Sequence, residues 1–186
     1  MTCNPIFKTP TLQTERLILR SATEADFEDL FALGSDPEVW ALHSEKDRYT
    51  LPKFKDYFKG GLNNELGAYT IIYLPENRII GFTRYYDLKP DANSVKIGYT
   101  FIAKEFWGSG INTELKLELL NHAFTQVSRV NFEVFEQNIR SQKAILKLGA
   151  KEIEPLGDRK RFVIEKQSVK RNINDALSSH SKTKQS

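Results

Sequence analysis

The chain has 186 residues, of which 40% are hydrophobic and 27% are charged, as is typical of a soluble globular protein with one full-sized core. The formal charge is +3, and residues 167–186 carry all of it, with four cations against one anion. Because the other residues are neutral by count, the sequence gives no sign of a nucleic-acid-binding surface, and we expect no DNA partner.

The N-terminal part of the chain predicts one strand and then helices. Residues 14–20 alternate apolar and polar side chains, which is the period of a half-buried strand. Thr23 suits the N-cap of a helix, because apolar residues recur at helical spacing over residues 24–33. Residues 34–37 break this helix, and a short helical turn and a second helix over residues 51–62 follow.

Three strands come next and are joined by short turns. Residues 68–74, 79–88 and 94–102 are rich in β-branched and aromatic side chains. Residues 75–78 and 89–93 contain Pro and Asn, which favour turns. These three strands therefore resemble successive hairpins.

The rest of the chain alternates between helices and strands. An apolar stripe with the 3.6-residue period predicts a long amphipathic helix over residues 111–127. A strand over residues 129–135, a short helix over residues 138–148 ended by Gly149, and a final strand over residues 159–165 follow. This order indicates an α+β domain with a mixed sheet and helices on its faces.

The composition also limits where the protein works. We expect a single domain over residues 1–166 and a disordered basic tail over residues 167–186, which are polar and Ser-rich. The one cysteine, Cys3, forms no intramolecular disulfide, and no segment resembles a signal peptide or a bilayer span. The three histidines lack cysteine partners at metal-ligand spacing. We therefore expect a cytoplasmic protein without a metal site or a membrane partner.

The most informative segment is residues 96–110, where a strand ends in a glycine-rich turn and a helix begins at once. Glycines let consecutive N–H groups curl toward one point, and a helix N-terminus attracts anions, so the turn suits a phosphate. A plain connection without a ligand remains an alternative. Two common phosphate motifs fail: Thr113 occupies the third glycine position of a dinucleotide-binding motif, and no Walker A run is present.

A third pattern fits better. Four motifs occur in the order that is typical of one family: Ile97-Gly98-Tyr99, Trp107-Gly108-Ser109-Gly110, Asn138-x-x-Ser141 and Lys147-Leu148-Gly149. Over about residues 10–165 the chain resembles the GCN5-related N-acetyltransferase (GNAT) family, and residues 14–20 resemble its branch of ribosomal-protein N-terminal acetyltransferases. The resemblance implies a mostly antiparallel sheet, splayed between its fourth and fifth strands, with helices on both faces and acetyl-coenzyme A (acetyl-CoA) in the split.

The resemblance also implies which residues bind that cosubstrate. The backbone of Phe101 and Ile102 would bond the pantetheine arm, Asn138 would hold the arm from the other side, and Ser141 would lie near the thiol sulfur. The pyrophosphate would be held by the N–H groups of Trp107, Gly108, Ser109, Gly110, Ile111 and Asn112. We therefore expect anion binding by backbone groups and not by a basic face.

Two residues depart from the family pattern. Glu105 stands where members often have Gln or Arg, and its side chain would be unfavourable beside phosphate unless it points away. Lys96 stands where members often have an acid, which removes the commonest candidate for a general base.

Acetyl transfer to an amine needs a deprotonated nucleophile, a polarised thioester carbonyl and a proton for the leaving thiolate. An N–H near Phe101 is a candidate oxyanion donor, and Ser141 is a candidate partner of the thiolate, although a serine there can also simply cap its helix. Glu133 and His43 are candidate bases. Each has a non-catalytic interpretation as a paired or solvated side chain, and a water chain is a third option.

We therefore expect an N-acetyltransferase that moves the acetyl group of acetyl-CoA to a primary amine directly in a ternary complex. The acceptor is a protein N-terminus or a small amine, and a homodimer is left open. Because Lys96 removes the commonest base, a non-catalytic acyl-CoA-binding sensor is the alternative.

Overall fold

The computed structural model describes residues 9–168, so all but the first two residues of the predicted basic tail lie outside the described part. Eight strands within it form one sheet in the order β1-β2-β3-β4-β5-β6-β8-β7. Neighbouring strands are antiparallel except for β5 and β6, which are parallel. This is the mixed, mostly antiparallel sheet that was expected.

The predicted elements are present, with small changes at their ends. The strands are β1 (Leu12–Gln13), β2 (Leu17–Ser21), β3 (Ala68–Tyr73), β4 (Arg78–Lys89), β5 (Ser94–Ile102), β6 (Arg129–Phe135), β7 (Lys151–Leu156) and β8 (Arg159–Glu165). The helices are α1 (Phe27–Gly34), α2 (Pro37–Trp40), α3 (Leu51–Leu62), α4 (Ile111–Ala123) and α5 (Ile139–Lys147).

The sequence analysis missed β1 and β7 and made α4 four residues too long. β1 has only two residues, and β7 is an edge strand in which every side chain except that of Ile153 is exposed, so it lacks apolar alternation. α4 ends at Ala123, after which the N–H groups of Thr125 and Gln126 donate to carbonyls three residues back and form turns instead of a further helical turn.

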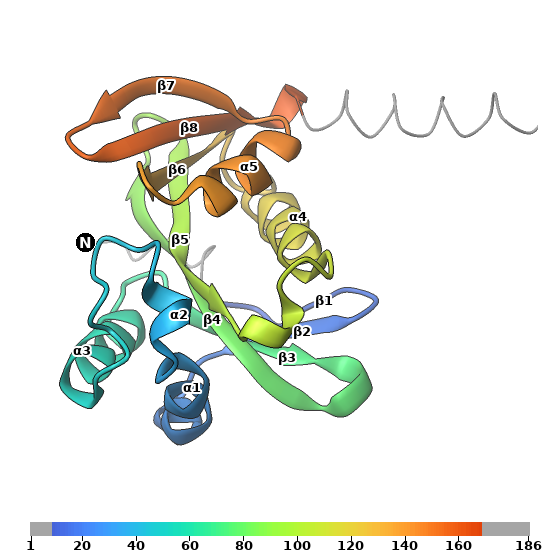
Figure 1. Cartoon of the computed structure of the whole chain (residues 1–186). Coiled ribbons are helices and arrows are strands. Elements are labelled where there is room, and N and C mark those ends of the chain that lie inside the picture. Colours follow the sequence, from blue (N-terminus) through green and yellow to red (C-terminus); the bar gives the residue numbers. More distant parts are fainter. Residues whose placement is uncertain (1–8, 169–186) are drawn as a thin grey trace, which may run out of the picture.

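Two hydrophobic cores lie on opposite faces of the sheet. Leu115 and Leu119 of α4 pack with Tyr69 and Ile71 of β3 in one core. The other core joins helices α1 to α3 to the sheet and consists of Leu30, Val39, Trp40, Phe54, Tyr57, Phe58, Ala68, Phe82 and Phe101. Figure 1 shows α1, α2 and α3 grouped apart from α4, so helices cover both faces, as expected.

The sheet opens between β5 and β6. These strands pair only over residues 94–96 and 129–131. Beyond that point β5 stays with β4, and β6 stays with β8 up to Phe135. A register shift between β4 and β5 coincides with Tyr99, whose φ of 51° is in the left-handed region. The fourth and fifth of the strands predicted from the sequence therefore separate after three residue pairs.

Neighbouring glycines in α3 test the second core. A Cβ at Gly61 would lie 2.3 Å from Cζ of Phe82, which is fully buried, whereas a Cβ at the exposed Gly60 meets nothing closer than Arg84 Nη1 at 3.5 Å. We expect Gly61→Ala to lower the free energy of unfolding by about 1–3 kcal/mol through overpacking. Gly60→Ala should raise it by about 0.5–1 kcal/mol, because alanine favours the helix. Urea denaturation measures both, and equal effects would contradict this packing.

Candidate active site

The glycine loop between β5 and α4 presents free N–H groups. Gly108 and Gly110 have φ of 79° and 84°, in the left-handed region that favours glycine. The N–H groups of Trp107, Ser109 and Ile111 are bonded to Lys104 O, Phe106 O and Ser109 Oγ. Those of Gly108, Gly110 and Asn112 have no acceptor among the described residues. The loop therefore offers three donors at alternate positions, next to the positive end of the α4 dipole.

These three residues line a cavity of about 420 Å³, named here the glycine-loop cavity, which also includes Trp107. Ser109 and Ile111, which were predicted beside them, do not line it. Four of the six residues of the predicted loop thus line the cavity, and the other two do not.

Helix α5 contributes three cationic side chains to this cavity, and none of them was predicted from the sequence. Arg140, Lys143 and Lys147 also line the glycine-loop cavity, and the Arg140 guanidinium lies 3.6 Å from the Trp107 ring centroid. The cavity therefore offers cationic side chains as well as backbone N–H groups to an anion. The i, i+3, i+7 spacing of the three cations, which places them on one helical face, was a signal in the sequence.

Ion pairs hold the loop and keep Glu105 away from it. Arg16 pairs with Glu114 of α4 at 2.6 Å and donates from Nη1 to the Ser109 carbonyl at 3.3 Å. Glu105 pairs with Arg78 at 2.5 Å and does not line the cavity. The acidic side chain that would be unfavourable beside a phosphate therefore points elsewhere.

At the end of β5 that lies beside the split, every second residue directs its backbone N–H and C=O groups into the split. Ala103 donates its N–H to the carbonyl of Ile80 in β4 at 2.8 Å, and the Phe101 carbonyl lies against Gly81 of the same strand. Because backbone groups alternate between the two edges of a strand, those of Thr100 and Ile102 point toward the split instead. The Ile102 carbonyl already accepts the Trp107 indole N–H at 3.0 Å. The N–H groups that point toward the split are thus those of Thr100 and Ile102, on either side of Phe101, near which the oxyanion donor was expected. Of the two residues expected to bond the pantetheine arm through their backbone, Ile102 faces the split and Phe101 faces β4.

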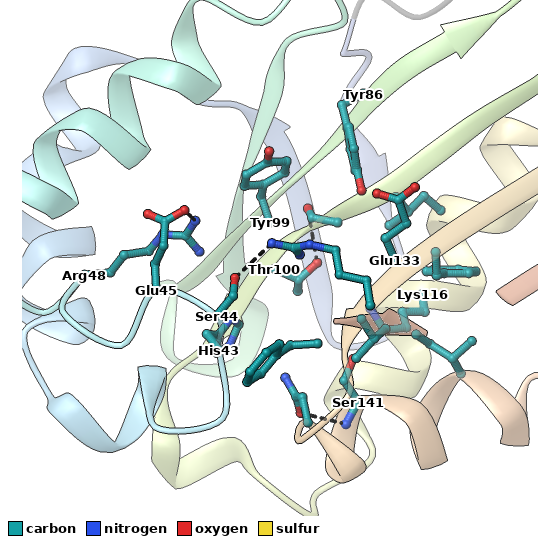
Figure 2. A pocket seen from close by; sticks show the side chains of 18 residues that line it. His43, Ser44, Glu45, Arg48, Tyr86, Tyr99, Thr100, Lys116, Glu133 and Ser141 are labelled. Carbon is teal, nitrogen blue, oxygen red and sulfur yellow. Dashed lines mark hydrogen bonds and ion pairs between the residues drawn. The ribbon is translucent and has the colours of Figure 1, made fainter. Parts of the chain in front are cut away.

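A second cavity of about 300 Å³ opens beside the first, and we name it the Arg48 cavity. Figure 2 shows Arg48 and Glu45 on one side of it and Lys116, Glu133 and Ser141 on the other. The residues that line both cavities are His43, Thr100, Lys116, Asn138 and Ser141. The two cavities therefore meet at the split between β5 and β6.

Asn138 and Ser141 lie at this junction. The resemblance implied a position for both residues beside the split. Asn138 is the N-cap of α5, and its Oδ1 accepts the N–H of Ser141 at 3.1 Å. The asparagine thus caps the helix, which leaves its Nδ2 as a donor toward the cavity. The hydroxyl of Ser141 has no partner among the described residues, so it is free to face a ligand.

Both candidate bases line the Arg48 cavity, but neither is arranged as a free base. Glu133 is paired with Lys96 at 2.5 Å. Lys96 is also 2.9 Å from Asp87, and although burial opposes it, hydrogen bonds to these two carboxylates raise the pKa of Lys96. Burial, together with the charges of Arg48 and Arg140, lowers the pKa of His43 to about 4, so its imidazole is neutral at pH 7 and a weak proton acceptor.

Lys116 is a residue that the sequence analysis missed. It is only 4% exposed, and no described residue forms a hydrogen bond or an ion pair with its Nζ. Its ammonium lies 5.7 Å from the Phe132 ring centroid and lines both cavities. Burial lowers the pKa of Lys116 to about 8, so it is mostly charged at pH 7. The apolar stripe of α4 gave no sign of this, because burial of a lysine depends on the neighbouring strands.

Within residues 9–168 no group of three His, Cys, Asp or Glu side chains is placed to hold a metal ion. No helix in the same part of the chain is long and apolar enough to cross a membrane.

The burial of Lys116 predicts a gain in stability when its charge is removed. Since an unpaired buried ammonium is costly, we expect Lys116→Met to raise the free energy of unfolding at pH 7 by about 1–3 kcal/mol. The folded pKa lies below the unfolded value, so the gain should be full below about pH 8 and shrink toward pH 10.5. Denaturation at several pH values measures this, with the exposed Lys143→Met as control. A gain that is independent of pH would contradict the assignment.

Comparisons with known proteins agree with this geometry. A curated protein of Bacillus subtilis, named uncharacterized N-acetyltransferase YoaA, is 27% identical over 146 residues, which cover 75% of this chain and 82% of that protein. A GCN5-related N-acetyltransferase from Brucella melitensis has a similar fold, with a TM-score of 0.76 at 13% identity over 86% of this chain and 80% of that one.

A spermidine N-acetyltransferase from Vibrio cholerae, solved with CoA and spermine, also has a similar fold, with a TM-score of 0.69 at 16% identity over 84% of this chain and 99% of that one. The sequence profile of the acetyltransferase (GNAT) domain matches residues 16–151, which is most of the chain. The chain therefore belongs to the GNAT acetyltransferase family.

Proposed function

We propose that this protein transfers the acetyl group of acetyl-CoA to a primary amine in a ternary complex. The observation that carries the proposal is that two cavities meet at the split in the sheet. The glycine loop and the cations of α5, which suit phosphates, line one cavity, and neither lines the other. A donor and an acceptor that entered from opposite sides would meet there. Direct transfer then needs no acetylated residue of the chain.

The residues of the glycine-loop cavity fit acetyl-CoA in chemistry. The N–H groups of Gly108, Gly110 and Asn112, with the three cations of α5, would hold its phosphates. The side-chain Oδ1 of Asn112 is buried and has no partner within residues 9–168, and since it can only accept, it suits an amide N–H of the arm. When bound, acetyl-CoA supplies an activated acetyl group as a thioester.

The residues at the junction would support departure of the thiolate. Ser141 offers an unpartnered hydroxyl there, and Lys116 offers an ammonium in a buried setting. A hydrogen bond and a positive charge both lower the energy of negative charge, and more so where water is excluded. The free N–H at the β5 edge, from Thr100 or Ile102, would polarise the carbonyl.

The arrangement of the candidate bases favours water as the proton acceptor. Glu133 is engaged by Lys96, and the pKa of His43, at about 4, lies far below that of an alkylammonium. Of the three options that the sequence left open, the water chain is therefore the one that these contacts favour.

The acceptor is a protein N-terminus or a small amine. The resemblance of residues 14–20 to the ribosomal-protein branch favours the former, and a spermidine enzyme of the same fold illustrates the latter. We propose a cytoplasmic setting, since the single cysteine suits a reducing compartment.

The glycine loop can be tested directly. Gly108→Asp adds a negative charge beside the proposed phosphates and should weaken acetyl-CoA binding by about 100-fold or more, measured by calorimetry. Gly157→Asp is the matched control, because Gly157 also has a positive φ of 58° and open space around it, but it lies in the β7–β8 turn. Affinity that is unchanged in the Gly108 variant would contradict the loop assignment.

Thiol release in the presence of a panel of amines and peptides tests the reaction itself. We expect Ser141→Ala to lower kcat by about 10- to 100-fold and to leave the KM for acetyl-CoA nearly unchanged. An equal effect on both would mean that the serine is structural. Tight acetyl-CoA binding without thiol release on any amine would favour the non-catalytic sensor instead.

A further inference from the structure

The Arg48 cavity holds more positive charge than its carboxylates can neutralise. Its lining includes three cations, Arg48, Lys116 and Arg159, and two carboxylates, Glu45 and Glu133. This excess is local, because the chain outside its last twenty residues is neutral by count.

Both carboxylates already have cationic partners. Glu45 pairs with Arg48 at 3.0 Å, and Glu133 pairs with Lys96 at 2.5 Å. By contrast, Lys116 has no partner among the described residues, and Arg159 reaches only Asp158 at 4.0 Å and the hydroxyl of Ser44 at 3.0 Å. The charged groups of this lining that lack a close counter-ion among the described residues are therefore cations.

A fourth cation, Arg84, packs against a residue of the cavity lining. Arg84 is 8% exposed, and its guanidinium carbon lies 3.6 Å from the ring centroid of Tyr99, which lines the cavity. Its Nε and Nη1 are buried without hydrogen-bond partners, and no described carboxylate pairs with it. Since buried charges are weakly screened, this guanidinium adds to the positive potential in the cavity.

The remaining polar groups of the lining do not offset that potential. Burial raises the pKa of Tyr86, a lining residue, and that of Tyr57, which packs against Tyr99, so both phenols stay neutral. His43 is neutral at pH 7 because its pKa is lowered to about 4 by burial and nearby arginines. An ammonium group on an acceptor would find no free carboxylate here.

We propose that the acceptor of this enzyme carries a carboxylate close to its amine, and that Arg48 and Arg159 bind this carboxylate in the Arg48 cavity. The inference rests on the proposed acetyl transfer. Arginine recognises carboxylates with paired N–H donors, and such charge-assisted bonds are the strong ones. Lys116, at the junction of the cavities, disfavours the ammonium form of the amine and so favours the neutral nucleophile. This provides the nucleophile without a dedicated base.

Matched acceptors test the proposal with the full chain at one fixed ionic strength. Each pair shares the amine and differs in charge: β-alanine with its amide, and a short peptide with Asp at the second position with its Asn counterpart. Spermidine represents a purely cationic acceptor. We expect kcat/KM, from thiol release at saturating acetyl-CoA, to be about tenfold or more higher for the carboxylate member of at least one pair. Spermidine should be the poorest acceptor.

Substitutions of the two arginines test whether they are the groups that bind the carboxylate. Arg48→Gln and Arg159→Gln should each lower kcat/KM about tenfold for carboxylate acceptors and leave their neutral counterparts nearly unchanged, so that the preference disappears. Lys160→Gln is the control, because Lys160 is the next residue of the same strand, pairs with Glu152 at 3.1 Å and does not line the cavity. Equal rates within every pair, better turnover of spermidine, or an equal loss on all acceptors would overturn the proposal.

A separate measurement distinguishes failure of this inference from failure of the proposed function. If no amine releases thiol although acetyl-CoA binds, the proposed function is wrong. The carboxylate site is then judged by thermal shift in the presence of CoA. The carboxylate compounds should raise the melting temperature of the wild type more than their amides do, and this difference should be lost in Arg48→Gln. Absence of any difference in the wild type would overturn the carboxylate site by itself.

Discussion

The early end of the pairing between β5 and β6 is the constraint on which the rest of the structure depends. After three residue pairs, β5 keeps only β4 as a partner and β6 keeps only β8. The Lys96–Glu133 ion pair joins the two strands near the last pair, and the irregularity at Tyr99 marks where β5 changes register. The facing edge of β5 thereby keeps unpaired backbone groups, which a ligand with an extended, amide-bearing arm can bond as a strand would.

Opening a sheet in this way is costly, and several buried polar groups without partners among the described residues lie in or next to the two cavities. Among residues 9–168, Lys116 is buried without a partner, and Asn112 and Arg84 have buried polar atoms without hydrogen bonds. Such groups destabilise the isolated fold. The two cores on opposite faces of the sheet supply the compensating burial. Groups that reduce stability in this way are expected where a protein binds ligands.

Cationic and anionic side chains occupy different places in the domain, although their numbers in residues 1–166 are equal. Glu105, Glu114 and Glu133 are each held by a cation outside the glycine loop or at the edge of the split. The cations of α5 and Lys116 are left facing the cavities. A domain that is neutral by count thus has a positive surface in its cavities. The resemblance implied the backbone donors of the proposed anion site, but it did not imply its cationic side chains.

The sequence by itself determined the order of the elements other than β1 and β7, and the position of the glycine loop, because periodicity and glycine-rich turns are local properties. The resemblance to the family, and not a local pattern, pointed to Asn138 and Ser141, which line both cavities. The tertiary structure alone decided which ionisable groups are free. The pairing of Glu133 with Lys96 joins residues 37 apart, and the isolation of Lys116 depends on strands from both sides of the split. Burial and ion pairing shift acid–base properties through such distant contacts, and no short stretch of sequence contains them.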